Sequence, residues 1–540
     1  MTFTDYLQTQ PLLRVAVALM AGITAGDGIT EAFPALPPWS VWLWYSFMAL
    51  CLILELLSRQ HPYRQSALLF MAVFVGGIAM IDETKRNTVF PFSGNEMMTY
   101  EAVVFSEPQM RGKTLQCDLA LTSINGKPLK NAVNIKAAIL RDTITNDWKA
   151  IALGTGLRAQ SIMQPVRNFH SGNFNYVRWL HIHSFRATTF IYYSDWNTAS
   201  VSLKPMATLD RMRLYAMQQR QKLVSRLRLS KDEEDQQSAV VAAMVLGDKH
   251  AISHETKEAY SVSGASHILA LSGLHLSIIY SVLLLLLGRG FKRRWLSQAI
   301  ILLTVWGYVF LVSMGASVVR SAVMLSIYSM CVVSGRDKAS VNALSLAALC
   351  LLVANPLCLW DIGFEMSFMA VLGILMFYKH LYRLLFRKSE RKQHKNTNGN
   401  RMSQYLKDGL KAVWGMVSVS VAAQISTAPL VAYYFGRFSC YFLLTNFIVI
   451  PCATLIIYLA LAIFITAAIP PVNTFLLSFM DATSTLLNNA VRFIASLPHA
   501  SLENIHTSAI EIMCVYILIA IACIVYSHVR KLGGLIRKGA

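Results

Sequence analysis

Long apolar runs separated by short polar segments set the pattern of this chain. A helix needs about 20 apolar residues to cross the hydrocarbon core of a bilayer, and several of the runs reach or approach that length. We predict spanning helices at residues 11–29, 39–57, 66–82, 268–288, 296–314, 316–334, 340–354, 362–378, 412–435, 440–469 and 509–527. The segment 473–497 is amphipathic, and the sequence leaves open whether it spans or lies on the surface.

Between residues 97 and 200 the apolar period changes to two. Apolar and polar residues alternate over 115–121 and again over 133–139, which predicts half-buried strands. Asn125-Gly126 between these stretches is a hairpin-turn signal. Several short strands in one region predict a small barrel of the OB-like type. The predicted fold is therefore a polytopic α-helical membrane protein with a small OB-like β-barrel domain outside the cytoplasm.

The last part of the barrel region is rich in aromatic and basic residues. Aromatic rings stack on bases while arginine meets phosphate, so this composition suits single-stranded nucleic acid. A short amphipathic helix that docks the barrel on the membrane would have the same composition, and both interpretations stay open. The candidate DNA-binding residues are Arg167, Phe174, Tyr176, Arg178 and Trp179.

A basic amphipathic stretch follows the barrel region, at residues 205–231. We expect a helix that lies in the headgroup region of the membrane, with a DNA-facing role as the alternative. Its predicted apolar face consists of Leu209, Met212, Ala216, Leu223 and Leu227.

Polar residues gather at the start of the apolar run 268–288. A polar group that faces lipid costs several kcal/mol, so we expect the first turns to face protein or a hydrated path. Close packing of small residues is the alternative for serine and glycine. Two histidines eight residues apart do not have the spacing of four that zinc pairs on helices prefer, so no metal site is predicted. The polar residues are Asp248, Lys249, Ser266, His267, Ser272, Gly273 and His275.

Four further polar residues lie inside predicted spans: Arg320, Glu365, Gln424 and Asn446. A charged group at such depth costs a few kcal/mol unless it is paired or faces water. Arg320 and Glu365 form a candidate internal ion pair. A polar pore wall in which Arg320 meets phosphate is the alternative.

Composition agrees with a membrane protein. The chain is 55% hydrophobic and only 14% charged, with a net charge of +20, whereas soluble domains carry about 25% charged residues. The positive charge suits an anionic partner, although basic cytoplasmic turns account for much of it. Nine cysteines form no CxxC pair and no P-loop is present, so neither a zinc ribbon, a redox pair nor an ATP motor is predicted in this chain.

The basic turns also predict the orientation. If each run spans once, both termini lie in the cytoplasm and the barrel lies outside. The predicted units are N-terminal spans at 1–96, the barrel at 97–200, the basic helix at 201–235, a membrane core at 236–530 and a cytoplasmic tail at 531–540.

Five motifs in order resemble those of the ComEC-type competence family. They are GDK with SHILALSGLHLSI, then SVVRSAVM, NPLCLWDIGFEMSFMAVLGIL, AAQISTAPLVAYYFGRFS and TNFIVIPCATL. The N-terminal arrangement of three spans, a barrel and NFNYVRWLHIHSFRAT is also similar. The resemblance covers nearly the whole chain.

The resemblance implies an inner-membrane channel that carries single-stranded DNA into the cytoplasm during natural transformation. The implied partners are single-stranded DNA, membrane lipid, a periplasmic DNA receptor, a cytoplasmic strand-binding or motor protein, and a separate nuclease. Many family members carry a metallo-β-lactamase-like domain at the C-terminus. No HxHxDH motif exists here, so we expect a short form without that domain, with no cofactor and no enzyme activity.

A small-solute transporter or an intramembrane enzyme is the alternative function. Inward polar groups and broken helices also suit those classes. Under the channel hypothesis, the candidate lining residues are Asp248, Lys249, Ser266, His267, Ser272, His275, Arg320, Glu365, Gln424 and Asn446.

Overall fold

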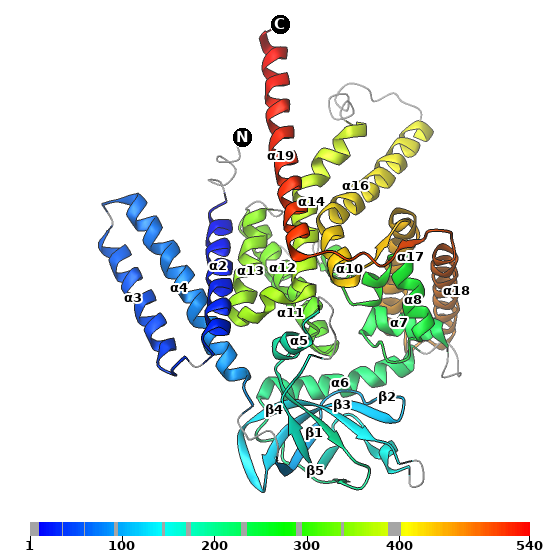
Figure 1. The fold of residues 1–540 in the computed structure, drawn as a ribbon. Coiled ribbons are helices and arrows are strands. Elements are labelled where there is room, and N and C mark those ends of the chain that lie inside the picture. The colour runs from blue at the N-terminus through cyan, green and yellow to red at the C-terminus, as the bar shows by residue number, and fades with distance from the viewer. Residues whose placement is uncertain are drawn as a thin grey trace.

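The computed structural model describes residues 10–34, 36–58, 60–90, 96–142, 146–168, 174–227, 235–287, 294–335, 340–386 and 401–539. Long helices stand above a small β-barrel, as Figure 1 shows. The predicted orientation rests on basic turns between the spans. Much of these turns lies outside the described residues, at 288–293, 336–339 and 387–400.

The three predicted N-terminal spans are present as helices. They are α2 (Pro11–Ala32), α3 (Ser40–Leu57) and α4 (Pro62–Thr88). Glycines allow α2 and α4 to pack backbone against backbone, since a Cβ at Gly22 would lie 2.0 Å from the carbonyl oxygen of Phe74. Small residues at such contacts are typical of helix packing in membranes.

The alternating region folds into a closed barrel. Strand β1 pairs with both β3 and β5, and the circuit runs β1-β3-β4-β6-β5-β1 with β4 and β6 parallel. This Greek-key circuit confirms the predicted OB-like barrel. The strands are β1 (Met97–Val104), β2 (Gln109–Arg111), β3 (Thr114–Ile124), β4 (Lys127–Leu140), β5 (Gly156–Gln164), β6 (Phe185–Ile191) and β7 (Trp196–Thr198).

The β3–β4 hairpin forms where the sequence predicts it. Asn125 and Gly126 have φ angles of 49° and 75°, and a two-residue hairpin turn of type I′ requires positive φ at both positions. The alternating apolar residues of 115–121 and 133–139 all point into the barrel core and are buried. Period two therefore placed both strands and their inward faces correctly.

Two helices connect the barrel to the membrane part (Figure 1). Helix α5 (Tyr176–Ile182) precedes β6, and α6 (Thr208–Arg226) packs on the barrel. Leu214 and Met217 of α6 are buried against the barrel residues Val103 and Phe105. The predicted apolar face of α6 is partly wrong, because Leu209 is 51% and Met212 55% exposed. The face of α6 that packs on the barrel is a neighbouring one, which contains Leu214 and Met217. The pattern of apolar residues in α6 alone does not show which face the barrel contacts.

The remaining helices form the membrane core. They are α7 (Gln236–Leu246), α8 (His254–Val262), α9 (Ser266–Leu269), α10 (Gly273–Leu287), α11 (Arg294–Leu311), α12 (Ala316–Val333), α13 (Val341–Ala354), α14 (Ile362–Phe386), α16 (Arg401–Phe435), α17 (Phe442–Ile465), α18 (Pro470–Ala495) and α19 (Ala509–Gly539). Two short strands, β8 (Phe438–Ser439) and β9 (Ser501–Leu502), pair beside them.

Among the described residues, nine helices are long and apolar enough to cross a membrane. This finding agrees with a multi-pass membrane protein. The predicted run 268–288 is different, because it is divided into α9 and α10 by the non-helical residues 270–272. The undecided segment 473–497 is a single helix, α18, packed along α17 (Figure 1).

Removing one buried side chain should loosen the barrel specifically. Leu119 is fully buried in the barrel core, and a buried leucine-to-alanine change costs about 2–5 kcal/mol. We expect Leu119→Ala to accelerate proteolytic cleavage within residues 97–200 of the purified full chain. Lys127→Ala, at an exposed position of β4, is the control and should leave the cleavage rate unchanged. Equal cleavage rates would contradict the closed barrel.

Candidate functional site: a broken helix beside the barrel

The break between α9 and α10 is held by a side chain. Ala270 is extended after the single turn of α9. The backbone N–H of Ser272 donates to Nδ1 of His275 at 3.1 Å, and the Ser272 hydroxyl lies 2.9 Å from the same nitrogen. His275 therefore supplies the hydrogen bond that the first turn of α10 would otherwise lack.

These contacts also determine the tautomer of His275. A backbone N–H can only donate, so Nδ1 of His275 must be the unprotonated nitrogen and Nε2 carries the hydrogen. The side chain is 1% exposed, and Nε2 has no hydrogen-bond partner among the described residues. The broken helix thus presents a buried donor that requires an acceptor, because such groups are almost always satisfied by protein or water.

The start of α9 lies against the start of α17. Gly264 has a φ of +83°, and a Cβ there would lie 2.9 Å from the Ser439 side chain. The Thr445 hydroxyl donates to the carbonyl oxygen of Ser263 at 2.8 Å. His267 lies 3.1 Å from the Gly264 carbonyl oxygen through Nδ1, and its ring is exposed, as is Ser266.

A second set of polar groups lies on α16 and α17. Asn446 donates to the Ser420 hydroxyl at 3.4 Å. Oδ1 of Asn446 and the hydroxyls of Ser418 and Ser439 are buried and have no partner within the described part of the chain. Gln424 is half-buried on α16. Buried polar atoms without a partner among the described residues therefore occur on α10, α16 and α17 and in β8.

The predicted pair of Arg320 with Glu365 is wrong. Nη1 of Arg320 donates to Oδ2 of Asp361 at 2.8 Å, with both side chains largely buried. Asp361 also accepts from the backbone N–H of Gly363 at the start of α14. Glu365, one turn further along, accepts from the Tyr434 hydroxyl at 3.0 Å. Asp361 thus has two roles: one carboxylate oxygen caps the start of α14, and the other accepts from Arg320.

The loop 247–250 joins the broken helix to the barrel. Gly247 ends α7 with a φ of 73°, and a Cβ there would lie 2.7 Å from Leu271, inside the break. At the other end, Nε2 of His250 lies 2.8 Å from Glu107, in the loop that leaves β1. Asp248 accepts from the backbone N–H of His250, and Lys249 is exposed. The structure therefore places Asp248 and Lys249 at the barrel junction.

The contact of Glu107 with His250 is the electrostatic centre of this junction. Arg220 of α6 lies 3.6 Å from Glu107, and Gln109 lies 2.7 Å from Nδ1 of His250. Burial alone would raise the pKa of Glu107, but the hydrogen bond with His250 and the charges of His250 and Arg220 bring that pKa down to about 2. The junction thus favours an ionised Glu107.

The same junction has the donor types of a cation site. Ligand atoms of Glu107, Asp248 and His250 lie within 4.8 Å of one another. The guanidinium of Arg220 already neutralises part of this negative charge. Glu107 is therefore in contact with both Arg220 and His250, and we interpret the cluster as an ion-pair network.

The candidate DNA-binding residues divide into two groups. Arg178 of α5 binds Asp27 at 2.8 Å and Glu31 at 2.9 Å, both on α2, and its guanidinium stacks over the ring of Trp360. Tyr176 and Trp179 stack on each other on α5. Arg167 and Phe174 are exposed beside the barrel. Arg178 thus ties the barrel to the spans, as the docking interpretation expects, and the role of the others stays a prediction.

Comparison with known families decides the identity of the core. A family model described as "Competence protein" matches residues 244–529, more than half of the chain. The chain belongs to the competence protein family. The matched region runs from the end of α7 to α19 and includes the broken helix, Arg320, Asp361 and the polar groups of α16 and α17.

One curated relative is similar over part of the chain. ComE operon protein 3 of Bacillus subtilis (strain 168) is 27% identical over 215 residues, which is 40% of this chain and 24% of the relative. The alignment thus spans about a quarter of that relative's length. No solved structure matches the chain.

Sequence reasoning missed three residues that hold the competence core and its junction with the barrel: Asp361, Glu107 and His250. Asp361 lies in the quoted motif DIGFEMSF, where its position before an apolar helix was the available signal for a cap. Glu107 and His250 carry no such signal, because they are 143 residues apart in sequence and neither belongs to a recognisable motif that predicts a contact.

Truncating Arg178 should destabilise the docking of the barrel. The change leaves the buried Asp27 with Lys85 alone, and removing one partner of a buried ion pair costs roughly 3 kcal/mol. We expect Arg178→Ala to lower the melting temperature of the purified chain, and Arg178→Lys to restore part of it. The exposed Arg167→Ala should have no effect. An unchanged melting temperature in Arg178→Ala would contradict the docking role.

Acid should weaken the barrel junction through Glu107. Because its pKa in the folded chain lies below the ordinary value of 4.5, this carboxylate stabilises the fold above pH 4.5. That stabilisation, of the order of 3 kcal/mol, is lost as the pH falls toward 2. We expect Glu107→Gln to reduce the fall in melting temperature between pH 5 and pH 3. Glu255→Gln, exposed on α8, should retain the wild-type profile, and identical profiles in all three would refute the contact.

Proposed function

We propose that this competence protein is an inner-membrane channel that passes single-stranded DNA into the cytoplasm. A polyanion cannot enter hydrocarbon, so the spans must enclose a hydrated path for it. Membership of the competence family implies a role in DNA uptake. The barrel then lies outside, and the ends of α2 and α19 that are remote from the barrel lie in the cytoplasm.

The observation that carries this proposal is a set of buried polar atoms in the competence core that have no partner among the residues the structure describes. Nε2–H of His275, Oδ1 of Asn446 and the hydroxyls of Ser418 and Ser439 belong to it. Buried groups of this kind are satisfied by ordered water or by a ligand. Neutral donors and acceptors suit a moving strand, because conduction requires sites that bind weakly.

Charge in the core supports weak rather than tight binding. Arg320 is paired with Asp361, so its charge toward a phosphate is largely offset. Glu365 hydrogen-bonds Tyr434, which keeps this carboxylate from presenting both oxygens freely to a strand. We place His267, Ser272, His275, Gln424 and Asn446 along the path on these grounds.

Under this proposal, other proteins act together with this chain. We assign direction to a cytoplasmic strand-binding or motor protein, delivery to a periplasmic DNA receptor, and degradation of the second strand to a separate nuclease. The chain itself then acts without a cofactor and without enzyme activity.

An intramembrane enzyme is the second candidate, and one observation favours it. The Ser272 hydroxyl lies 2.9 Å from an unprotonated ring nitrogen of His275, as in a nucleophile and base pair. Nε2 of that ring has no carboxylate partner among the described residues to orient it, which a serine–histidine hydrolase normally needs.

The test is DNA uptake in transforming cells that carry single alanine variants. We expect His275→Ala to reduce transformation at least about tenfold at normal protein level, because removal of the donor and of the helix-break hydrogen bond disturbs the path. Ser272→Ala should retain most activity if the path is a channel, since the Ser272 backbone N–H still donates to His275.

The exposed His506→Ala on the segment before α19 is the matched control. Normal transformation in His275→Ala would remove this histidine from the mechanism. A loss in Ser272→Ala as severe as in His275→Ala, with covalent labelling of wild-type Ser272 by a serine-reactive phosphonate, would favour the enzyme instead.

A further inference from the structure

Helix α18 carries a continuous polar stripe. Its members follow one another at intervals of four or three residues, which places them within about 80° of arc on a helix of 3.6 residues per turn. All are exposed except the half-buried Thr485. The stripe consists of Thr474, Ser478, Asp481, Thr485, Asn489, Arg492 and Ser496.

The stripe has the length of a membrane crossing. It extends over 22 residues, which corresponds to about 33 Å at 1.5 Å per residue, and the hydrocarbon core of a bilayer is about 30 Å thick. A separate apolar face lies beside it, formed by exposed Phe475, Phe479, Leu486 and Phe493. The third side of α18 is buried in the competence core. The helix therefore has a core face, a lipid-like face and a polar face.

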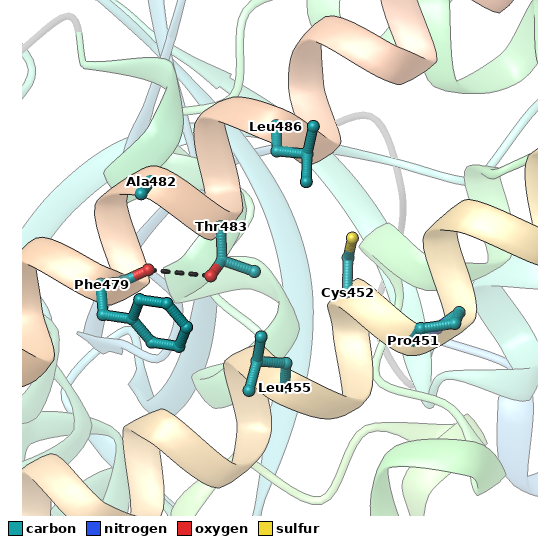
Figure 2. A pocket seen from close by; sticks show the side chains of 7 residues that line it. All are labelled: Pro451, Cys452, Leu455, Phe479, Ala482, Thr483 and Leu486. Atoms are coloured by element: carbon teal, nitrogen blue, oxygen red, sulfur yellow. Dashed lines mark hydrogen bonds between the residues drawn. The ribbon is translucent and has the colours of Figure 1, made fainter.

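Helix α18 is not itself one of the nine candidate spans, but it packs along one of them, α17. Its partner α17 is the most apolar of the candidate spans, with a mean hydropathy of 2.8. Figure 2 shows the two helices side by side, with Cys452 and Leu455 of α17 facing Phe479 and Thr483 of α18 across an apolar pocket. The stripe consequently runs through the same layer of the membrane as α17.

Lipid is an unsuitable neighbour for this stripe. Asp481, about one turn from the middle of the stripe, and Arg492, in the last turn of α18, have no ion-pair partner among the described residues. A charged side chain near the centre of a bilayer costs about 2.5–3.5 kcal/mol. The apolar face of the same helix already offers lipid a suitable surface. Water or another protein must therefore cover the polar face.

A second copy of the chain does not fit the charges. Copies in one membrane share their orientation, so a two-fold axis along the membrane normal would place each residue of the stripe opposite itself. Asp481 would then meet a second Asp481, and Arg492 a second Arg492. Like charges at such depth oppose that contact.

A charged helix, α8, packs against α18. Asn488, beside the stripe, accepts a hydrogen bond from the Tyr260 hydroxyl of α8 at 2.8 Å. The outer face of α8 exposes four titratable side chains: His254, Glu255, Lys257 and Glu258. Helix α8 leads back through the loop 247–250 to the barrel. The buried Tyr260–Asn488 hydrogen bond thus holds α8 against α18, and each helix has an exposed polar side.

We propose that the α8–α18 face, made of these two exposed polar sides, borders water through the full thickness of the membrane. It forms one wall of an aqueous groove that small hydrophilic solutes enter. The inference concerns water alone, so it stands or falls separately from the passage of DNA.

Cysteine accessibility tests the groove at three depths. In a chain whose nine native cysteines are replaced, single cysteines are placed at Ser478, Thr485 and Arg492 of the stripe. The matched controls are the neighbouring positions Phe479, Leu486 and Phe493 on the apolar face. A charged, membrane-impermeant methanethiosulfonate is applied to the full chain in membranes.

Only a hydrated thiol ionises and reacts readily. We expect each stripe cysteine to be modified at least about tenfold faster than its neighbour, at all three depths. Ser478→Cys and Thr485→Cys are small changes that preserve the fold, and normal protein level in the membrane verifies it. Equal slow rates at stripe and control positions would overturn the groove, whether lipid or a protein partner covers the face. Fast labelling of the stripe cysteines supports the groove whatever the transformation assay shows. If cells carrying His275→Ala also transform normally, the groove is retained and the proposed DNA path beside His275 is contradicted.

Discussion

Polar groups that lie at membrane depth must find a partner, and this constraint shapes the whole protein. Arg320 finds Asp361 and Glu365 finds Tyr434. Arg178 reaches across from the barrel to Asp27, which also binds Lys85. Each pairing joins elements far apart in sequence, so satisfying these charges also fixes how the helices and the barrel sit together.

The groups that stay unpaired are equally informative. Buried polar atoms without a partner among the described residues occur in the barrel and the N-terminal spans as well as in the family-matched region, where they include atoms of His275, Ser418, Ser439 and Asn446. Because buried polar atoms are almost always satisfied, Nε2 of His275 and Oδ1 of Asn446 call for water or a ligand. At the broken helix, one ring nitrogen of His275 accepts a hydrogen bond from the backbone N–H of Ser272. The other ring nitrogen is buried and has no partner among the described residues.

The barrel is connected to the membrane helices at two separate places, one on the N-terminal spans and one on the competence core. Arg178 fastens α5 to α2 on one side, and the contact of Glu107 with His250 fastens the loop 247–250 on the other. The second contact lies one packing step from the helix break, since Gly247 meets Leu271. A short chain of contacts, from Glu107 through the loop 247–250 and Leu271, therefore connects the barrel to the helix break that His275 holds.

The sequence by itself determined the barrel, the membrane class and nine of the eleven predicted spans, whereas the runs 268–288 and 340–354 contain only shorter helices among the described residues. Those features depend on hydrophobic period and run length, which are local properties, so α2 to α4 and the β3–β4 hairpin lie where the pattern predicts them. The family motifs likewise lie within continuous stretches. The tail beginning at 531 was placed as a separate unit, whereas α19 continues to Gly539.

Only the tertiary structure decided which polar residues pair. Glu365 and Asp361 are both acidic residues near one helix start, and nothing local tells which one Arg320 reaches. The face of α6 that meets the barrel, and the packing of α18 along α17, depend in the same way on surfaces from distant segments. Side-chain partners are set by three-dimensional proximity, and a one-dimensional pattern carries no information about proximity between residues as far apart as Glu107 and His250.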